Sequence, residues 1–427
     1  MPQPGDRVKI ATQQKTYDGF FMPSLNPKIV VIKLSSGYNA GFKRDEIKKI
    51  TVLKKYVPTP KKHILPQSEG QPIIAILHTG GTIASRVSYE TGGVVAQFTP
   101  EDLLVQFPEL AKCATLRSRL VANMMSENMR FAHYNILAKE VIAEWKAGAT
   151  GIIITHGTDT MHFTAAALSF LLPRVPVSVL LVGAQRSSDR GSTDAAQNLL
   201  AAVQFITQTD YAVLGICMHK TIEDNACVIL PALRTRKVHT SRRDAFQAVD
   251  SSPLAEIVIG GNIKANKDIP KRNSVWEQNF RPFDEKIRVG VLPMHTNMYA
   301  SEFLTYKGFD GLLLLGTGLG HCPIITFDAH TKEHNAILNS IKSLAKKSVV
   351  AIASQTGHGR INMDVYSPGR MLIDAGVIGN LHDMPWETAF IKLAWLLSHY
   401  PKKEAKRLFS LNLVGEITPI SALNEIT

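Results

Sequence analysis

The sequence predicts an α/β fold with two parallel-sheet domains, preceded by a small N-terminal β-barrel-like domain. From residue 72 onward, short apolar runs alternate with helix-like stretches, which is typical of a mostly parallel sheet covered on both faces. A polar, broken stretch at 262–285 interrupts this alternation, and a second series of the same kind follows it. Residues 1–53 contain only short strand-like runs between turn signals, which favours a small barrel.

These patterns divide the chain into five segments. We expect a small β domain at 1–53, a linker at 54–71, a large α/β catalytic domain at 72–261, an interdomain connection at 262–285, and a smaller α/β C-terminal domain with a tail at 286–427. The linker is predicted from its lysines and prolines, because proline restricts its neighbours to extended conformations. The small β domain contains no evident catalytic set, so we expect it to serve docking or packing.

Each predicted element rests on a local pattern of apolar residues, caps and turns. In the small domain, strand-like runs occupy 6–10, 19–22, 29–34, 38–42 and 50–53. In the large domain, strands are predicted at 73–77, 151–155, 176–182 and 212–218, and helices begin at Thr99 and occupy 134–147, the residues up to Leu172, and 194–206. In the last domain, strands are predicted at 287–292, 311–316 and 348–353, with helices near 332–346, 369–375, 385–398 and after Pro401.

The composition is that of a globular protein with sizeable cores. The chain has 427 residues, 45% of them hydrophobic and 20% charged, which suggests two or three domains. Four scattered cysteines without a Cys-x-x-Cys pair argue against a disulfide framework or a zinc site and for a reducing compartment. We expect a cytoplasmic protein without a membrane partner, because no signal-peptide core and no run of about 18–20 apolar residues occurs.

The net charge of +12 is compatible with a polyanionic partner, although many proteins are basic for no specific reason. The charge gathers in two basic clusters with little aromatic interleaving, so neither is typical of a single-strand stacking platform. The N-terminal cluster comprises Lys43, Arg44, Lys48, Lys49, Lys54, Lys55, Lys61 and Lys62, and the central cluster comprises Arg234, Arg236, Lys237, Arg242 and Arg243.

Two predicted strands each lead into a glycine followed by a threonine. The first leads into Thr79-Gly80-Gly81-Thr82, and the second into Thr155-His156-Gly157-Thr158-Asp159. The carboxyl ends of parallel strands meet at one edge of a sheet, so both hydroxyls and the carboxylate should converge there. A threonine hydroxyl attacks well only when a base removes its proton. Lysine can serve as that base, and spacing alone leaves both Lys237 and Lys220 open.

Structural roles compete with these catalytic ones. Thr158 is also a plausible helix N-cap, and Asp159 a partner of the helix dipole. His78, His156 and His321 lack metal-type spacing and are expected to pack or to form hydrogen bonds. The Gly316-Thr317-Gly318-Leu319-Gly320 run lacks the lysine of a phosphate loop and is interpreted as a turn.

The two glycine-threonine motifs resemble the signatures of the bacterial-type L-asparaginase family. The resemblance rests on Thr79-Gly80-Gly81-Thr82-Ile83-Ala84 and His156-Gly157-Thr158-Asp159-Thr160-Met161, and it continues through Gly183-Ala184-Gln185-Arg186, the Lys237 region, Gly316-Thr317-Gly318 and Asp383-Met384 with Glu387. It covers roughly residues 73–415 and implies an asparaginase-like two-domain fold. The preceding β unit, with Gly37-Tyr38-Asn39-Ala40-Gly41, resembles the family of D subunits of archaeal glutamyl-tRNA(Gln) amidotransferases (GatD).

The resemblance implies a role for each matched residue. Thr82 matches the nucleophile, while Thr158, Asp159 and Lys237 match the relay and base. Ser126 matches a residue that holds the substrate carboxylate, Glu127 stands where plain asparaginases tend to have glutamine, and Tyr89 is the candidate mobile-loop tyrosine. No metal site and no cofactor in this chain are implied.

For the whole protein, the resemblance implies ammonia release from glutamine or asparagine for a GatE-type partner subunit. That partner would use ATP and Mg to amidate Glu-tRNA(Gln) to Gln-tRNA(Gln), within a heterotetramer of two D and two E subunits built on a homodimer core. Two alternatives stay open: a free-standing cytoplasmic L-asparaginase with an unrelated N-terminal module, and a non-catalytic scaffold associated with tRNA.

Overall fold

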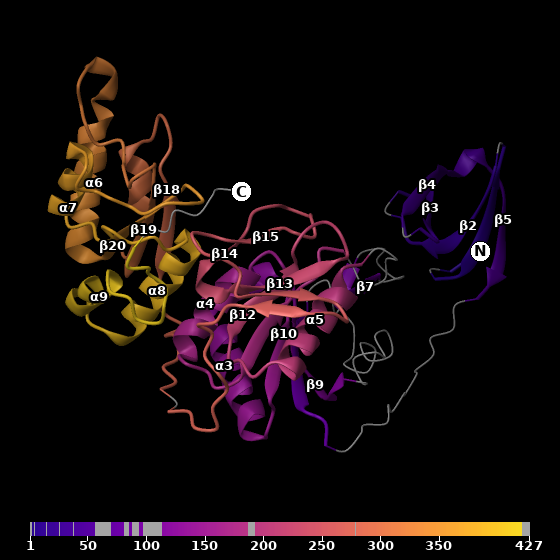
Figure 1. Ribbon diagram of the computed structural model, residues 1–427. Helices are drawn as coiled ribbons and strands as arrows, with labels where there is room; N and C mark the ends of the chain where they lie inside the picture. Colours follow the sequence, from indigo (N-terminus) through magenta and orange to yellow (C-terminus); the bar gives the residue numbers. More distant parts are fainter. Residues whose placement is uncertain are drawn as a thin grey trace.

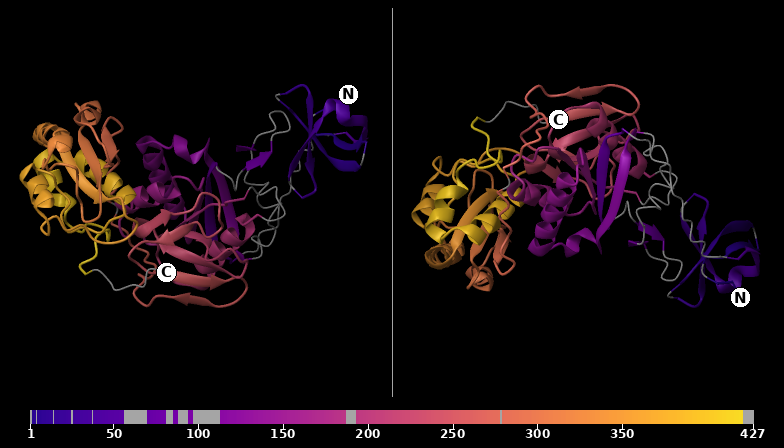
Figure 2. Two further views of the ribbon diagram at one scale, coloured as in Figure 1. Left: turned by 90° about the horizontal axis from the view of Figure 1, so that it is seen from above. Right: turned by 90° about the horizontal axis from the view of Figure 1, so that it is seen from below.

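The structure is a computed structural model of the chain. It describes residues 2–3, 5–13, 15–24, 26–36, 38–55, 70–80, 85–87, 94–96, 113–186, 193–277 and 279–420. Figures 1 and 2 show the small N-terminal β unit and the C-terminal domain on opposite sides of a large central domain.

The N-terminal unit is a five-stranded antiparallel sheet in the order β4-β3-β2-β1-β5. Val8, Ile10, Val30, Ile32 and Phe42 form its core, and the residues that separate them within a strand are exposed or partly exposed, as expected for strands with one buried face. A short 3₁₀ helix, η1 (Arg44–Glu46), leads into the last strand. The strands are β1 (Arg7–Thr12), β2 (Thr16–Met22), β3 (Ile29–Leu34), β4 (Asn39–Lys43) and β5 (Ile47–Lys54).

The large domain is built on an eight-stranded sheet in the order β17-β16-β13-β12-β11-β10-β6-β9. The neighbours β6, β10, β11 and β12 run parallel, as the strand–helix alternation predicts, and β9, a strand that the sequence did not predict, adds a further parallel strand beside β6. The parallel strands are β9 (Thr115–Met124), β6 (Ile73–Gly80), β10 (Gly151–Thr155), β11 (Ser178–Val182) and β12 (Leu214–His219).

The other edge of this sheet is antiparallel, which the sequence did not predict. It comprises β13 (Ala226–Pro231), β16 (Ala255–Val258) and β17 (Ile263–Ala265). β17 falls within the stretch assigned to the interdomain connection, where the surrounding residues are polar. Apolar periodicity locates a strand but carries no information about its direction, so the mixed character of the sheet was not accessible from the pattern.

Helices cover both faces of the large sheet. Successive residues of a strand point to opposite faces, so a strand that is apolar throughout presents apolar side chains on both. Ala75, Ile152 and Ile154 pack with α3 (Phe131–Lys146) and α4 (Met161–Leu171) on one face. Ile76 and Ile153 pack with α5 (Ala195–Gln208) on the other. The parallel strands are therefore buried on both sides, which fixes the positions of their ends.

The C-terminal domain is a three-stranded parallel sheet, β18-β19-β20, between two pairs of helices. α6 (Glu333–Lys347) and α7 (Ser367–Asp374) cover one face, and α8 (Trp386–His399) and α9 (Lys402–Phe409) cover the other. Ile391 and Ala394 of α8 also belong to the core that contains α4, so this helix packs against both domains. The strands are β18 (Val289–Pro293), β19 (Gly311–Gly316) and β20 (Val349–Ser354).

Shorter elements complete the described chain. They are the strands β7 (Ser85–Val87), β8 (Val94–Ala96), β14 (Thr235–Lys237) and β15 (Phe246–Ala248), and the 3₁₀ helices η2 (Ser126–Asn128), η3 (Ala232–Arg234), η4 (Ala300–Tyr306) and η5 (Ala329–Thr331). Among the residues that the structure describes, no helix has the length and apolar character needed to cross a membrane.

Candidate active site

The site lies where β6 and β10 end, at the carboxyl edge of the parallel sheet. The two strands are direct neighbours, with Thr155 opposite His78. Gly80 ends β6 with φ +100°, and a Cβ at this position would lie 2.4 Å from the carbonyl oxygen of Met124. Only glycine fits there, because it tolerates both the positive φ and the close approach. Thr82 and Tyr89 lie just beyond, outside the described residues.

Buried hydrogen bonds hold these two strand ends together. The His78 ring contacts the hydroxyls of Thr155 (Nδ1 to Oγ1, 2.9 Å) and Ser118 (Nε2 to Oγ, 2.7 Å). The hydroxyl of Thr79 donates to the carbonyl oxygen of Thr155 at 3.0 Å. His78 therefore has the hydrogen-bonding role that the sequence predicts, and it fixes the end of β6 relative to β10.

His156 shapes the turn that follows β10. Its Nδ1 lies 2.7 Å from the Gly157 carbonyl and its Nε2 lies 2.8 Å from Oγ1 of Thr164, so Nδ1–H donates and Nε2 accepts. Burial lowers the pKa of this imidazole to about 4, so it is neutral at pH 7. A neutral, doubly bonded ring holds the turn without adding charge to the site.

Lys237 reaches the same turn from a distant part of the chain. Its Nζ donates to Oγ1 of Thr158 at 2.8 Å and to Oδ1 of Asp159 at 2.7 Å. The Lys237 side chain is only 9% exposed, whereas that of Asp159 is 69% exposed. Hydroxyl, amine and carboxylate thus meet at one point, and the arrangement can move a proton between a hydroxyl and an amine held by a carboxylate.

The two lysines that spacing left open have different partners in the structure. Lys220 forms an ion pair with Glu256 at 2.7 Å, and its side chain is 44% exposed. Lys237 instead contacts both polar residues of the second signature. The difference between the lysines depends on a long-range contact between β14 and the turn after β10, which no local sequence pattern reveals.

Ser126 packs directly on this turn. It is buried in η2, and its carbonyl oxygen accepts a hydrogen bond from Oγ1 of Thr160 at 2.6 Å. A Cβ on Gly157 would lie 2.8 Å from the Ser126 Cβ, and a Cβ on Gly183 would lie 2.7 Å from Cγ2 of Thr158. The two glycines of these motifs therefore make room for the polar side chains. Glu127 is exposed beside Ser126.

Sequence reasoning did not find the carboxylates that support the central cluster. Arg234 pairs with Asp383 (Nη2 to Oδ2, 2.5 Å), and Arg236 pairs with Glu387 (Nε to Oε1, 2.9 Å). Both halves of each pair were visible, as a basic cluster and as the late Asp-Met…Glu segment. Their pairing was not, because the partners lie about 150 positions apart in the chain.

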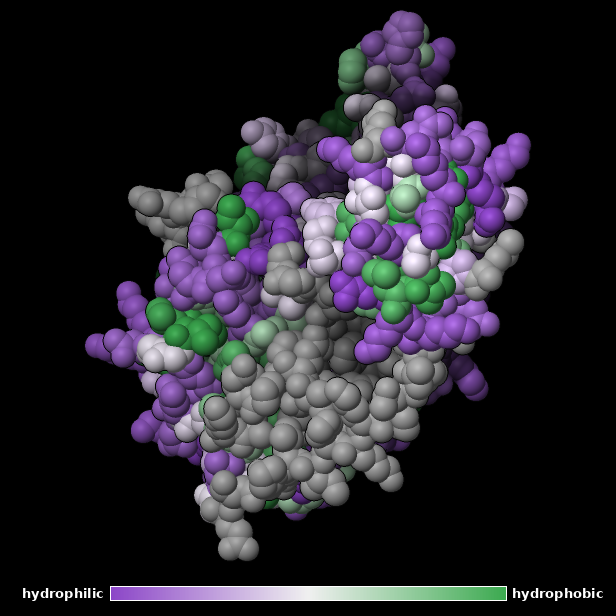
Figure 3. All heavy atoms as spheres, turned by 90° about the vertical axis from the view of Figure 1, so that its right-hand side faces the viewer, coloured by the Kyte–Doolittle hydropathy of each residue, from purple (hydrophilic) through white to green (hydrophobic). Residues whose placement is uncertain are grey.

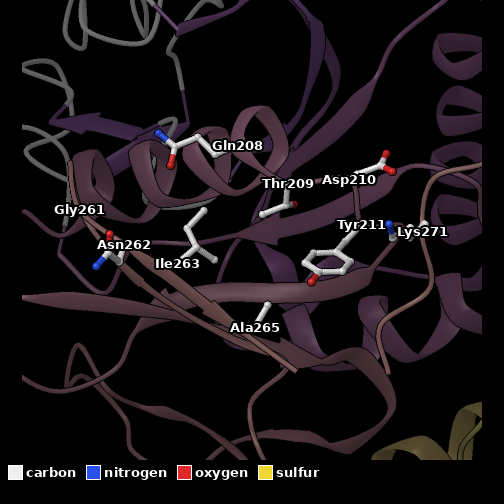
Figure 4. A pocket seen from close by; sticks show the side chains of 9 residues that line it. All are labelled: Gln208, Thr209, Asp210, Tyr211, Gly261, Asn262, Ile263, Ala265 and Lys271. Atoms are coloured by element: carbon white, nitrogen blue, oxygen red, sulfur yellow. The ribbon is translucent and has the colours of Figure 1, made fainter. Parts of the chain in front are cut away.

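A large cavity elsewhere in the domain is not this site. It has a volume of about 550 Å³ and is open to solvent, and residues such as Thr209, Tyr211 and Asn262 line it (Figure 4). Tyr211 precedes β12, so the cavity adjoins the amino end of a parallel strand, opposite the edge where ligands bind in such sheets. In the described part of the chain, no group of three or more His, Cys, Asp or Glu could hold a metal ion.

Comparisons with known proteins agree with this geometry. Residues 2–53 match the GatD N-terminal domain family, residues 73–271 the asparaginase N-terminal family, and residues 288–409 the glutaminase/asparaginase C-terminal domain family. The D subunit of the glutamyl-tRNA(Gln) amidotransferase from Pyrococcus abyssi is 39% identical, over 97% of this chain and 95% of the relative. The corresponding D subunit from Methanococcus maripaludis is 41% identical, over 97% of both chains.

The chain belongs to the GatD family. Solved structures extend the likeness to plain asparaginases. The L-asparaginase from Thermococcus kodakarensis matches with a TM-score of 0.67 at 25% identity, and L-asparaginase I from Vibrio cholerae with 0.68 at 26%. Each match covers 82% of this chain and 100% of the other. The GatD family thus combines an asparaginase-like body with the additional β unit at 2–53.

Proposed function

We propose that this chain is the amidase subunit of a tRNA-dependent amidotransferase and releases ammonia from glutamine or asparagine. The observation that carries the proposal is the position of Lys237 Nζ, 2.8 Å from Thr158 and 2.7 Å from Asp159, beside the end of β6. Membership of the GatD family and the asparaginase-like fold support the same conclusion.

The chemistry begins with Thr82, which follows the end of β6 by two residues. Its hydroxyl oxygen attacks the side-chain amide carbon and passes its proton, through Thr158 and Lys237, to the leaving nitrogen. The C–N bond breaks, ammonia leaves, and an ester to Thr82 is left. Water then hydrolyses the ester and restores the hydroxyl, with glutamate or aspartate as the second product. While Lys237 holds the proton, the carboxylate of Asp159 balances its positive charge.

Substrate binding is assigned to the residues around the same turn. Ser126, which packs on Gly157, holds the substrate carboxylate, and the exposed Glu127 beside it is a second substrate-binding residue. Tyr89 closes over the substrate from the segment that follows β7. The division of the chain at 53, 71, 261 and 285 completes the proposal: a small β domain, a linker, a catalytic domain, a connection and a C-terminal domain.

The proposed context is a cytoplasmic complex. The ammonia passes to a GatE-type partner subunit, which uses ATP and Mg to amidate Glu-tRNA(Gln), and two copies of each subunit form a heterotetramer on a homodimer core. The names of the relatives, amidotransferase D subunits matched over 95–97% of their length, support this assignment. The alternative of a free-standing L-asparaginase draws on the solved asparaginases, but their likeness covers 82% of the chain and β unit 2–53 has its own family match.

The decisive measurement is ammonia release from glutamine and asparagine, with and without the partner subunit and Glu-tRNA(Gln). We expect the partner and charged tRNA to accelerate release, and Thr82→Ala to lower kcat by at least about 10³-fold. Fast hydrolysis by the chain alone that gains nothing from the partner would favour the free-standing asparaginase. Unchanged hydrolysis by the Thr82→Ala variant would contradict the assignment of this nucleophile. No hydrolysis by the parent chain under any condition would favour the non-catalytic scaffold associated with tRNA.

A further inference from the structure

The segment that carries Lys237 is held between the two α/β domains. η3 and β14 run from the end of β13 to Lys237, and within the described residues β14 pairs only with the three-residue strand β15. A two-stranded ribbon of this length is marginal by itself. What fixes Lys237 must therefore come from side chains.

Alternation along the strand divides those side chains between the domains. Lys237 points to the turn of the large domain, where it contacts Thr158 and Asp159. Arg236 points the other way and donates from Nε to Oε1 of Glu387, in the first turn of α8 of the C-terminal domain, at 2.9 Å. The catalytic lysine thus has an interdomain ion pair on the adjacent residue.

Glu387 contacts the second catalytic arm as well. Its Oε1 lies 3.7 Å from Nε2 of His162, which stands three residues after Asp159 at the start of α4. The side chains of Glu387 and His162 are 5% and 6% exposed. One buried carboxylate of the C-terminal domain therefore adjoins both the strand of Lys237 and the helix that follows the Thr158–Asp159 turn.

A second buried pair reinforces the first. Arg234, 4% exposed, pairs with Asp383, which also accepts hydrogen bonds from the backbone and hydroxyl of Thr418. Burial opposes ionisation of Asp383, but the hydrogen bonds from Thr418 and Arg234 outweigh it and keep the pKa of this carboxyl below its usual value. In addition, Thr388 Oγ1 donates to the carbonyl oxygen of Leu233 at 2.9 Å. Asp383, Glu387 and Thr388 of the C-terminal domain thus all bind the segment 233–236.

We propose that Glu387 and Asp383 are positioning residues for Lys237, so that the placement of the C-terminal domain sets the amidase rate. The proposal rests on the proposed function, in which Lys237 acts on Thr158. Glu387 does not touch the reacting atoms; it acts through Arg236 and His162. A partner that shifts the C-terminal domain relative to β14 would change the Lys237–Thr158 distance, and this gives the fold a route for coupling ammonia release to the partner.

The test is Glu387→Gln, in the full chain together with its partner subunit. The substitution keeps the shape but removes the charge that orients Arg236. We expect kcat to fall about tenfold or more with little change in KM, because a misplaced catalytic group slows the chemical step. Adding Arg236→Gln to Glu387→Gln should cost no more than Glu387→Gln alone, since Arg236 has already lost its interaction with the carboxylate.

A structural readout keeps this test separate from activity. Competitive acetylation of Lys237, measured by mass spectrometry, should rise in Glu387→Gln because the amine loses its fixed position. The matched control is Asn135→Ala, which removes two buried hydrogen bonds between α3 and Phe283 (2.9 and 2.8 Å) without touching β14. This control should lower the melting temperature and leave both kcat and Lys237 acetylation unchanged.

Two outcomes would overturn the positioning role: Glu387→Gln lowering only the melting temperature, or the control variant lowering kcat and raising Lys237 acetylation as much. If instead Thr82→Ala hydrolyses amides as the parent does, the proposed nucleophile fails. Lys237 acetylation in Glu387→Gln still answers the positioning question in that case.

Discussion

The two basic clusters of the chain have opposite environments in the folded protein. The described cations of the N-terminal cluster are exposed, and among the described residues only Lys43 pairs with a carboxylate, Glu46, at 3.5 Å. Every cation of the central cluster contacts a carboxylate. The pairs are Arg234–Asp383, Arg236–Glu387, Lys237–Asp159, Arg242–Asp244 and Arg243–Asp224.

The cations of the central cluster are used in ion pairs within the fold, whereas most described cations of the N-terminal cluster face solvent. Residues 1–55 contain 11 lysines and arginines against 4 aspartates and glutamates, a net charge of +7 out of +12 for the chain. Figure 3 views the molecule from the side on which the β unit lies, and hydrophilic residues dominate its coloured surface. More than half of the net charge therefore lies in residues 1–55, whereas each cation of the central cluster is paired with a carboxylate.

The largest expected effect is the loss of Lys237, the member of the central cluster for which a catalytic role is proposed. Lys237→Met should lower kcat for glutamine or asparagine hydrolysis by about 10³-fold, the range found when a general acid–base group is removed. The control is Lys220→Met, which breaks an ion pair of the same 2.7 Å length, with Glu256. Steady-state ammonia release measures both. If the two variants lose the same activity, Lys237 is only one half of an ion pair and not a catalytic group.

This pair of lysines also shows where sequence reasoning ends. The glycine-threonine turns at 79–82 and 155–159 were visible because each follows an apolar run, and a parallel sheet places both turns at one edge. The sequence did not choose between Lys237 and Lys220, because the choice depends on where β14, which follows β13, lies in the fold. Asp383 and Glu387 were seen only as a motif, since ion pairs between residues 149 and 151 positions apart leave no periodic trace.

The same limit applies to the fold. Most elements of the parallel part were predicted close to their observed ends, for example 311–316 for β19 (Gly311–Gly316), but the edge strand β9 (Thr115–Met124) was not predicted. The antiparallel edge of the large sheet was missed. β13 (Ala226–Pro231) is as apolar as its parallel neighbours, and only its hydrogen bonding to β12 reveals its direction. Thr82 and the Thr99 helix start lie outside the described residues and stay predictions.

The next largest effect should be a difference in the free energy of unfolding between two variants of the central cluster. One variant breaks the buried pair Arg234–Asp383, and the other breaks the more exposed pair Arg242–Asp244. Arg234→Met leaves the 2% exposed Asp383 carboxylate with less compensation, so we expect the free energy of unfolding to fall by about 3 kcal/mol. Arg242→Met breaks a pair whose arginine is 53% exposed and should change it by less than about 1 kcal/mol. Urea unfolding of both variants measures the difference. Equal losses would mean that burial does not distinguish the two pairs.

The smallest effect concerns the N-terminal cluster and leaves catalysis untouched. Neutralising Lys48, Lys49 and Lys54 to glutamine should weaken non-specific binding to a single-stranded oligonucleotide of unrelated sequence, because exposed lysines release counterions from the phosphates they contact. The slope of log K against log salt should become smaller by about 2, since each contacted phosphate contributes about 0.7. Salt titration by fluorescence anisotropy measures this slope, and basal ammonia release should equal that of the parent chain.

The matched control for this measurement neutralises Arg242 and Arg243, whose charges are already balanced by Asp244 and Asp224. Removing an arginine from such a pair leaves a carboxylate that repels phosphate, so affinity can fall, but the number of phosphates contacted stays the same and the slope should not change. A slope that falls equally in both variants would show that the paired cations also contact the polyanion. The difference in environment between the clusters would then say nothing about where the charge of this chain acts.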